Sequence, residues 1–172
     1  NREGDRRWRI YRTWAGGGEE ISMGYGRWPA WSPDGKFIAY QGCDERASRC
    51  GLWLIDADGA NPRQLTDAPG DAMPAWSPDG ARLAFAAPER SGTWDVHVLE
   101  LATGRVWTLA SGPAIDAHPT WSPDGRWVAF LSNREGPWAI YAVEVGSGQV
   151  SKVTNLPGDL PDWYETQITW GR

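Results

Sequence analysis

A segment of twelve residues occurs three times in this chain at a constant spacing. The copies read PAWSPDGKFIAY, PAWSPDGARLAF and PTWSPDGRWVAF, and they begin at Pro29, Pro74 and Pro119. The spacing between their tryptophans is 45 residues in both intervals, from Trp31 to Trp76 and from Trp76 to Trp121. A constant period of this length is typical of folds in which one supersecondary unit is stacked or arranged radially. The repeat therefore limits the possible folds more than any other feature of the 172 residues.

Each repeat is predicted to contain four short strands. In the first complete repeat, RWPAW and KFIAY flank the turn SPDG, in which proline presets φ and glycine takes left-handed backbone. KFIAY alternates polar and apolar residues like a half-buried strand, and GLWLID and PRQLT follow on either side of the turn ADGAN. No stretch of ten or more residues combines helical periodicity with caps. Four strands in about 40–45 residues favour a β-propeller blade, with a solenoid of hairpins as the alternative.

We therefore expect an all-β chain, a single β-propeller of four-stranded antiparallel blades over residues 1–172. The expected blade parts are three full blades and two partial ones, with the bounds 1–26 (partial), 27–70, 71–115, 116–160 and 161–172 (a first strand). The partial assignments follow from likeness, because NREGDRRWRIYRTW at the N-terminus matches NREGPWAIYAVEV, and ETQITWGR resembles HPTWSPDG cut short. One strand of the second type is thus missing between the two ends.

An open ring leaves strand edges unpaired, and the sequence allows three ways in which these edges could be covered. In the first, which we favour, the chain is part of a ring of roughly six to eight blades. Alternatively, residues 165–172 close against the N-terminal strands in a four-bladed ring, or two copies join end to end. The expected partners of the chain therefore include a homo-oligomer or the remainder of a longer chain that closes the ring.

Composition excludes few functions. The net charge of −5 argues against nucleic acid as the main partner, because phosphate binding requires a basic face. No apolar run approaches the roughly 18 residues of a membrane span, and no signal peptide is recognised at the start of the sequence. Cys43 and Cys50 flank a short polar loop between two predicted strands, so we expect a hairpin disulfide, with two free thiols as the alternative. Such a disulfide indicates an oxidising compartment, periplasmic or secreted.

The repeat also carries a family likeness. The pattern P-x-W-S-P-D-G-x-x-[ILV]-A-[FY], followed by [LI]-[WY]-x-[IVM]-[DE] and L-T, resembles the WD40-like repeat of TolB-type β-propellers. The same repeat occurs in tricorn-type and prolyl-oligopeptidase-type propeller domains. The whole motif matches residues 27–66, 72–109 and 117–154, and parts of it match 1–23 and 165–172. The motif is specific for the fold but says little about function.

This resemblance implies a ring whose first strands line a central channel, with the loops from fourth to first strands at one mouth. Three carboxylates, Asp71, Asp116 and Glu165, stand five positions before a repeat tryptophan and are expected at that mouth, where Gly26 holds the same place in another repeat. Three positions before the tryptophans stand Trp28, Met73, His118 and Gln167. Clustered carboxylates bind a cation, a basic peptide or a sugar. The alternative is that Asp71 and Asp116 only bond their own loops.

The loop LPDWYE lengthens the last repeat by about four residues and carries Trp163 and Tyr164. Adjacent exposed aromatic side chains stack on a sugar or a proline-rich peptide. The alternative is a plug that packs against the open blade edge. The aspartates of the three SPDG turns, Asp34, Asp79 and Asp124, are expected to form turns rather than to bind metal.

Together these features predict a non-enzymatic interaction module that binds a protein segment or a glycan through one channel mouth, with no cofactor, metal or catalytic residue. No G-x-S-x-G serine accompanies His118, and no P-loop or HExxH motif is present. The candidate ligand-binding residues are Asp71, Asp116, Glu165, His118, Trp28, Trp163 and Tyr164. Two alternatives remain, a non-catalytic gating propeller of a larger serine peptidase and a carbohydrate-active propeller enzyme.

Overall fold

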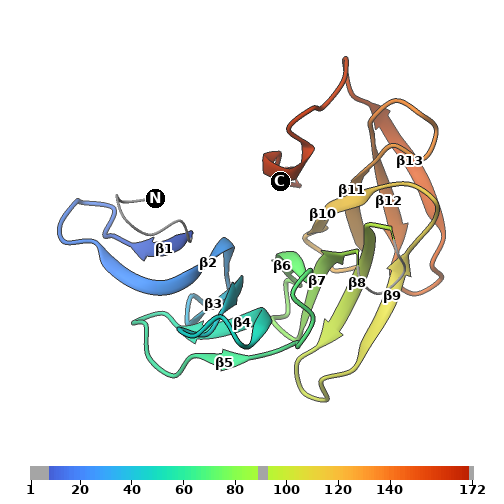
Figure 1. Ribbon diagram of the computed structural model, residues 1–172. Helices are drawn as coiled ribbons and strands as arrows, with labels where there is room; N and C mark the ends of the chain where they lie inside the picture. The colour runs from blue at the N-terminus through green and yellow to red at the C-terminus, as the bar shows by residue number, and fades with distance from the viewer. Residues whose placement is uncertain (1–7, 89–92, 171–172) are drawn as a thin grey trace.

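A computed structural model describes residues 8–88 and 93–170, which form three antiparallel sheets (Figure 1). The first contains β1 (Arg9–Arg12), β2 (Ile21–Trp31), β3 (Phe37–Cys43), β4 (Cys50–Asp56) and β5 (Arg63–Gln64). The second contains β6 (Ala72–Trp76), β7 (Arg82–Ala87), β8 (Asp95–Glu100) and β9 (Val106–Ala110). The third contains β10 (Asp116–Trp121), β11 (Trp127–Ser132), β12 (Ala139–Glu144) and β13 (Val150–Asn155).

Strands within each sheet follow one another in chain order, so every sheet is a meander of neighbouring hairpins. The predicted all-β architecture of four-stranded antiparallel blades is confirmed. In the part of the chain that the structure describes, the only helix is the 3-10 turn η1 (Trp163–Glu165), and none has the length and apolarity needed to cross a membrane. The exact blade boundaries stay a prediction, and residues 1–7 and 171–172 of the two partial blades lie outside the described residues.

The SPDG turns explain how each first strand reverses into the second. In the first of them, Ser32 Oγ donates to Asp34 Oδ1 at 2.7 Å, and the backbone N–H of Lys36 donates to the same oxygen at 3.1 Å. Gly35 takes the left-handed backbone that the turn requires, with φ of 70°. The hydrogen bond from Ser32 holds the pKa of Asp34 below its usual value. The other two SPDG turns repeat these bonds, so their aspartates lie in turns as expected.

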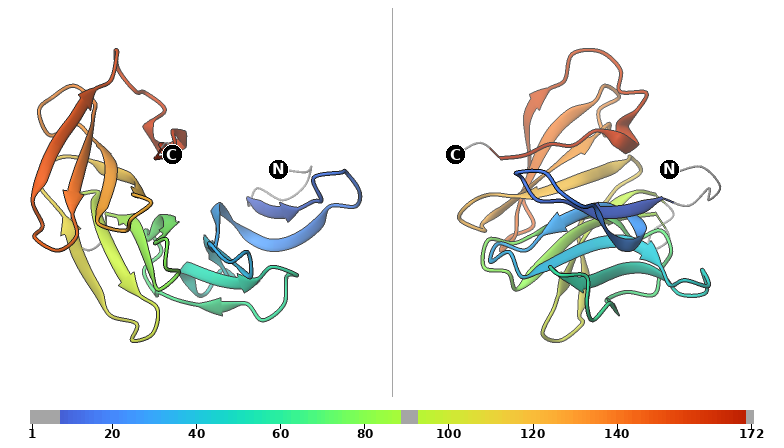
Figure 2. Two further views of the ribbon diagram at one scale, coloured as in Figure 1. Left: turned by 180° about the vertical axis from the view of Figure 1, so that it is seen from behind. Right: turned by 90° about the vertical axis from the view of Figure 1, so that its left-hand side faces the viewer.

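The three sheets lie along an open arc, with the inner strands β2, β6 and β10 next to one another (Figures 1 and 2). Neighbouring inner strands are joined by a hydrogen bond that recurs with the repeat: the indole Nε1 of Trp76 donates to Ala30 O at 3.0 Å, and that of Trp121 to Ala75 O at 3.2 Å. The core fills the spaces between adjacent sheets, for example Phe85 between the first and second sheets and Phe130 between the second and third.

The passage from the first partial blade into the next differs from the prediction of a separate strand RWPAW. Here β2 runs without a break through both blades, and β1 therefore joins a five-stranded sheet. Gly24 and Gly26 allow this continuity. Gly24 has φ of 123°, and a Cβ on Gly26 would lie 2.5 Å from both Gln41 O and the Tyr40 ring. Side chains at these positions would prevent the close approach of β2 and β3.

The C-terminal segment also differs from the expected strand. Residues 166–170 form no ladder, although the Nε1 of Trp170 donates to Thr120 O at 2.9 Å and so repeats the bond between inner strands. Each first strand forms its ladder only with the second strand of its own blade, as β6 does with β7 and β10 with β11. No such second strand accompanies residues 166–170 among the described residues, so the segment occupies the place of a first strand without belonging to a sheet.

Candidate functional site

The inner strands meet around a channel pocket of about 170 Å³. Equivalent positions of four successive repeats line it, namely residues 28–30, 73–75, 118–120 and 167–168. The sequence alignment placed Trp28, Met73, His118 and Gln167 at one repeat position, and the structure brings all four to this pocket. The channel thus presents a different side chain from each repeat at one level.

Three of these side chains stand on unusual backbone. Trp28, Met73 and His118 have φ of 50°, 57° and 52°, which is a left-handed conformation that non-glycine residues seldom adopt. In each inner strand the pairing register shifts at this residue and the proline after it, which is a β-bulge. The bulge changes the direction in which the side chain points. Such backbone is retained where the surrounding structure fixes it, often at functional sites.

The mouth of the channel is covered by Trp163 and Tyr164. Tyr164 packs edge-on against Trp28, with ring centroids 4.7 Å apart. The ring of Trp163 meets Trp94 edge-on, with centroids 5.4 Å apart, and stacks at a tilt on Trp138, with centroids 5.9 Å apart. These contacts agree with the plug that the sequence left as one of two alternatives, but the plug sits in the channel mouth. We call residues 163–165 the aromatic plug.

His118 lies directly beneath the aromatic plug. Its side chain is 5% exposed, and its Nε2 has no hydrogen-bond partner among the described residues. Burial lowers the pKa of His118, although backbone groups of Trp163 and Tyr164 and the charge of Glu165 act in the opposite direction. The Nε2 atom of His118 is therefore a buried polar atom at the lining of the channel pocket.

Arg27 connects the two ends of the described chain, and the sequence analysis missed it. It forms an ion pair with Glu165, which lies 138 residues further along the chain. Its guanidinium also lies over three aromatic rings, 4.7 Å from Trp8, 4.6 Å from Trp28 and 5.3 Å from Tyr164. No local pattern indicates a contact at this separation. Only the position of Arg27, directly before the channel residue Trp28, distinguishes it from the other arginines of the N-terminal region.

The carboxylates Asp71 and Asp116 are fully buried and do not line the channel pocket. Asp116 pairs with Arg134 at 2.7 Å, and that guanidinium lies 4.8 Å from the centre of the Tyr141 ring. In the first blade Gly26 replaces the carboxylate because the Tyr40 ring occupies the space. A part for Asp71 and Asp116 in ligand binding stays a prediction. The sequence singles out Arg134 as part of the repeat, because the tetrapeptide NREG at residues 133–136 also occurs at residues 1–4.

The charge of Glu165 at the mouth is thus balanced by Arg27, and the buried Asp116 behind it has an arginine partner of its own. Across residues 8–88 and 93–170, no three His, Cys, Asp or Glu side chains gather closely enough to hold a metal ion. The arrangement suits a ligand that brings aromatic rings and a single carboxylate, as the aromatic plug itself does.

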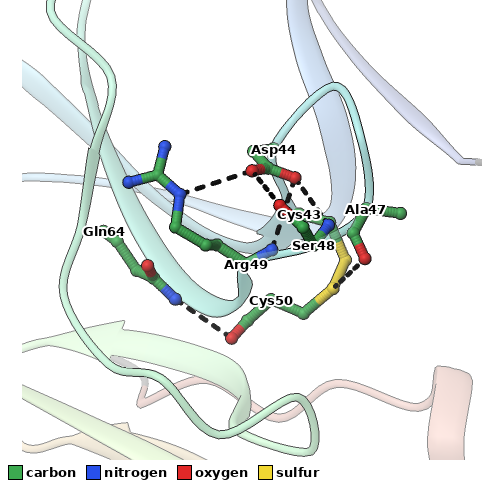
Figure 3. A network of polar contacts seen from close by, with 7 residues as sticks. All are labelled: Cys43, Asp44, Ala47, Ser48, Arg49, Cys50 and Gln64. Carbon is green, nitrogen blue, oxygen red and sulfur yellow. Dashed lines mark hydrogen bonds and ion pairs between the residues drawn. A yellow bond between two sulfur atoms is a disulfide. The ribbon is translucent and has the colours of Figure 1, made fainter.

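A disulfide joins Cys43 and Cys50 at the end of the β3–β4 hairpin, on the partner pair that closes the ladder (Figure 3). Within the loop, Asp44 accepts hydrogen bonds from Ser48 N and Oγ, each at 2.8 Å, and from the side chain of Arg49. The bonds from Ser48 hold the pKa of Asp44 well below its usual value. The loop borders a small apolar pocket together with Trp8 and Arg27. The expected disulfide is therefore present.

Comparison with known proteins assigns most of the chain to one family. The family model described as the TolB beta propeller domain matches residues 18–164. No curated protein matches the chain. Among solved structures, the putative TolB from Agrobacterium tumefaciens superposes with a TM-score of 0.76 at 26% identity, covering 88% of this chain and 57% of that one. TolB from Acinetobacter baumannii superposes with a TM-score of 0.70 at 25% identity, covering 84% of this chain and 37% of that one.

An oligogalacturonate lyase in complex with manganese has the same fold, with a TM-score of 0.62 at 22% identity over 86% of this chain and 42% of that one. At that identity the likeness concerns the fold alone. The chain spans little more than half the length of the Agrobacterium protein and less than half of the other two.

Proposed function

Because the chain belongs to the TolB β-propeller family, we propose that it is a non-enzymatic interaction module that binds a segment of a partner protein at the channel mouth. The described side chains at the mouth are packed rings and arginine–carboxylate pairs, an arrangement suited to recognition. The residues proposed to form the site are Trp28, His118, Arg27, Trp94 and Trp138.

One observation supports this proposal above the others: the mouth already holds a short segment of its own chain. The aromatic plug presents two aromatic rings followed by a carboxylate, and each finds a partner, the rings among tryptophans and Glu165 on Arg27. A partner segment with the same order of side chains fits the same contacts. The rings of Trp163 and Tyr164 are occupied by these contacts, so we favour a protein segment over a glycan stacked on them.

The disulfide and the family together support an extracytoplasmic location, since disulfides persist in oxidising compartments. Since the matched structures extend well beyond the region matched by this chain, a longer chain or a second copy is proposed to supply the rest of a ring.

The test replaces the plug and offers it in trans. The double variant Trp163→Ala/Tyr164→Ala is titrated with a fluorescein-labelled peptide of residues 159–167, and binding is followed by anisotropy. We expect the variant to bind the peptide at least roughly tenfold more tightly than the unaltered chain, whose mouth is occupied. Circular dichroism confirms that the variant is folded, and Tyr164→Ala alone serves if it is not.

The matched control is the same peptide with both aromatic residues changed to alanine, which is expected not to bind. Adding Arg27→Ala to the variant is expected to weaken binding, because it removes the partner of Glu165. A folded variant that fails to bind the aromatic peptide contradicts the proposal.

A further inference from the structure

His118 stands where the channel pocket meets the aromatic plug. It lines the pocket together with Trp28, and backbone groups of Trp163 and Tyr164 act on its imidazole. The left-handed backbone of His118 and the bulge at Pro119 fix the direction of the side chain. The imidazole is therefore held between the inner strands and a 3-10 turn that lies outside the sheets.

Closure of the mouth over His118 penalises the charged form of its side chain. The side chain is 5% exposed, and its Nε2 meets no hydrogen-bond partner among residues 8–88 and 93–170. One tautomer of the neutral imidazole leaves that nitrogen as a lone pair, whereas the imidazolium carries a hydrogen on both nitrogens. A buried cationic N–H without an acceptor costs more than a buried neutral nitrogen. The closed mouth thus favours the uncharged side chain.

The charged side chains around His118 do not offset this penalty. The elements packed against it carry such groups toward the mouth, namely Glu165, Arg27, Asp71, Asp95, Asp116 and Arg134. Glu165 is paired with Arg27 and Asp116 with Arg134, so each of these two carboxylates already faces a guanidinium. Burial lowers the pKa of His118 and outweighs the opposing effects of the plug backbone and of the Glu165 charge.

We propose that the channel mouth is a proton-linked switch, which closes over the aromatic plug with His118 neutral and opens when His118 takes up a proton. The inference rests on the proposed function, because the mouth that opens is the one that a partner segment enters. A partner segment that covers His118 in place of the plug is subject to the same linkage, so acid releases either occupant.

The direction of the pH dependence follows from the charge of the protonated side chain. In the open mouth His118 contacts water, and its pKa returns toward the usual histidine value of about 6.5. Closure is therefore most favourable above that pH, where both states are uncharged. It weakens as the pH falls, because the open state takes up the proton more readily than the closed state. Carboxylates ordinarily lose their charge only below about pH 5, so the window from about pH 5.5 to 7.5 reports on histidine.

The first experiment measures the titration of His118 itself. The chain contains two histidines, His97 and His118, so their Cε1–H resonances are resolved by NMR and assigned through His118→Gln. We expect His118 to titrate at least about half a pH unit lower in the unaltered chain than in Trp163→Ala/Tyr164→Ala, whose plug lacks both rings. Tyr164→Ala alone serves if circular dichroism shows the double variant to be unfolded. An equal or higher titration point in the unaltered chain overturns the inference.

The second experiment measures the linkage in the binding of the plug peptide. The labelled peptide of residues 159–167 is titrated into the folded double variant at about pH 7.5 and again at about pH 5.5. Because binding displaces one proton from an open-state histidine, we expect the Kd to be roughly tenfold higher at the lower pH.

The matched controls use the two histidines. Adding His118→Gln to the double variant is expected to abolish the pH dependence, since glutamine has no proton to release in this range. Adding His97→Gln is expected to leave the change at roughly tenfold. His97 lies in β8 with its ring 5.4 Å from that of Phe85, and it does not line the channel pocket. Circular dichroism at both pH values establishes that each variant is folded.

The outcomes separate this switch from the proposed function. Absence of binding at the higher pH contradicts the proposed function, and the NMR titration, which needs no peptide, then decides the inference alone. Equal affinity at both pH values, or tighter binding at the lower one, overturns the inference and leaves the proposed function standing. A tenfold loss that persists in His118→Gln assigns the proton to another group and overturns the inference as well.

Discussion

The tryptophans of the repeat show how a single residue joins one blade to the next. The indole of Trp121 is almost fully buried, donates to Ala75 O at 3.2 Å, and lies under the guanidinium of Arg82 at 4.9 Å. Trp31 stands at the same repeat position but is half exposed. The same residue type thus has a structural role only where a preceding inner strand supplies a carbonyl. Conformity to the repeat pattern alone does not distinguish the two cases.

We predict that Trp121→Phe lowers the free energy of unfolding by roughly 1–3 kcal/mol, because it removes one hydrogen bond and part of a buried ring. The matched substitution Trp31→Phe is expected to change it by less than about 0.5 kcal/mol. Urea denaturation of both variants under the same conditions measures the difference. Equal losses would show that the indole bond between inner strands contributes nothing measurable.

At the scale of the element, the hairpin β3–β4 and its loop depend on a covalent link. The disulfide closes the hairpin on the side of Trp8 and Arg27. Gly51 next to it has φ of 151°, and a Cβ there would lie 2.2 Å from Thr66 O, so this end of β4 is closely packed. The loop residues are held by Asp44 as well, but those bonds are exposed to water.

Reduction of Cys43–Cys50 is expected to destabilise the chain by about 2–3 kcal/mol in the chain-entropy model, because the unfolded chain regains the freedom of a short loop. The double variant Cys43→Ala/Cys50→Ala is expected to lose a similar amount and to become insensitive to dithiothreitol. Thermal unfolding with and without reductant measures both effects. If the unaltered chain were as insensitive to reductant as the variant, the disulfide would have no role in stability.

Elements were predicted well from sequence where a local rule decides them. The SPDG turns and the strands after them follow from proline, aspartate and glycine in fixed order. The single long strand β2 and the 3-10 turn at Trp163–Glu165 were not predicted. The first depends on the space beside Gly26, and the second on rings from distant strands, so neither is visible in a local window.

At the scale of the whole molecule, the three blades form an arc whose hollow is partly filled by the C-terminal segment (Figure 2). The repeat period predicted the propeller blades, and it aligned Trp28, Met73, His118 and Gln167 at one repeat position, which the structure brings to one pocket. It did not predict that Asp71 and Asp116 are buried, or that Arg27 reaches Glu165. Pairings of that kind depend on where the arc brings distant segments together.

Removal of residues 156–172 tests how much the C-terminal segment contributes to the stability of the chain and to the cover of the channel tryptophans. The truncated chain is expected to lose roughly 2 kcal/mol or more of stability, since the ring contacts of Trp163 and Tyr164 disappear. It is also expected to bind more of the dye ANS, because Trp28, Trp94 and Trp138 lose their cover. Fluorescence titration and urea denaturation give the two readouts, and an unchanged dye signal would mean that the tryptophans are covered by other groups.

The left-handed residues of the three inner strands have a further consequence for how such a protein diversifies. Tryptophan, methionine and histidine share one backbone geometry there, at Trp28, Met73 and His118. The main chain is therefore set independently of the side chain, and the proline that follows is the same each time. Substituting these three residues changes the side chains that a ligand in the channel pocket meets and leaves the backbone unchanged. One scaffold can therefore acquire new specificities through a few independent substitutions.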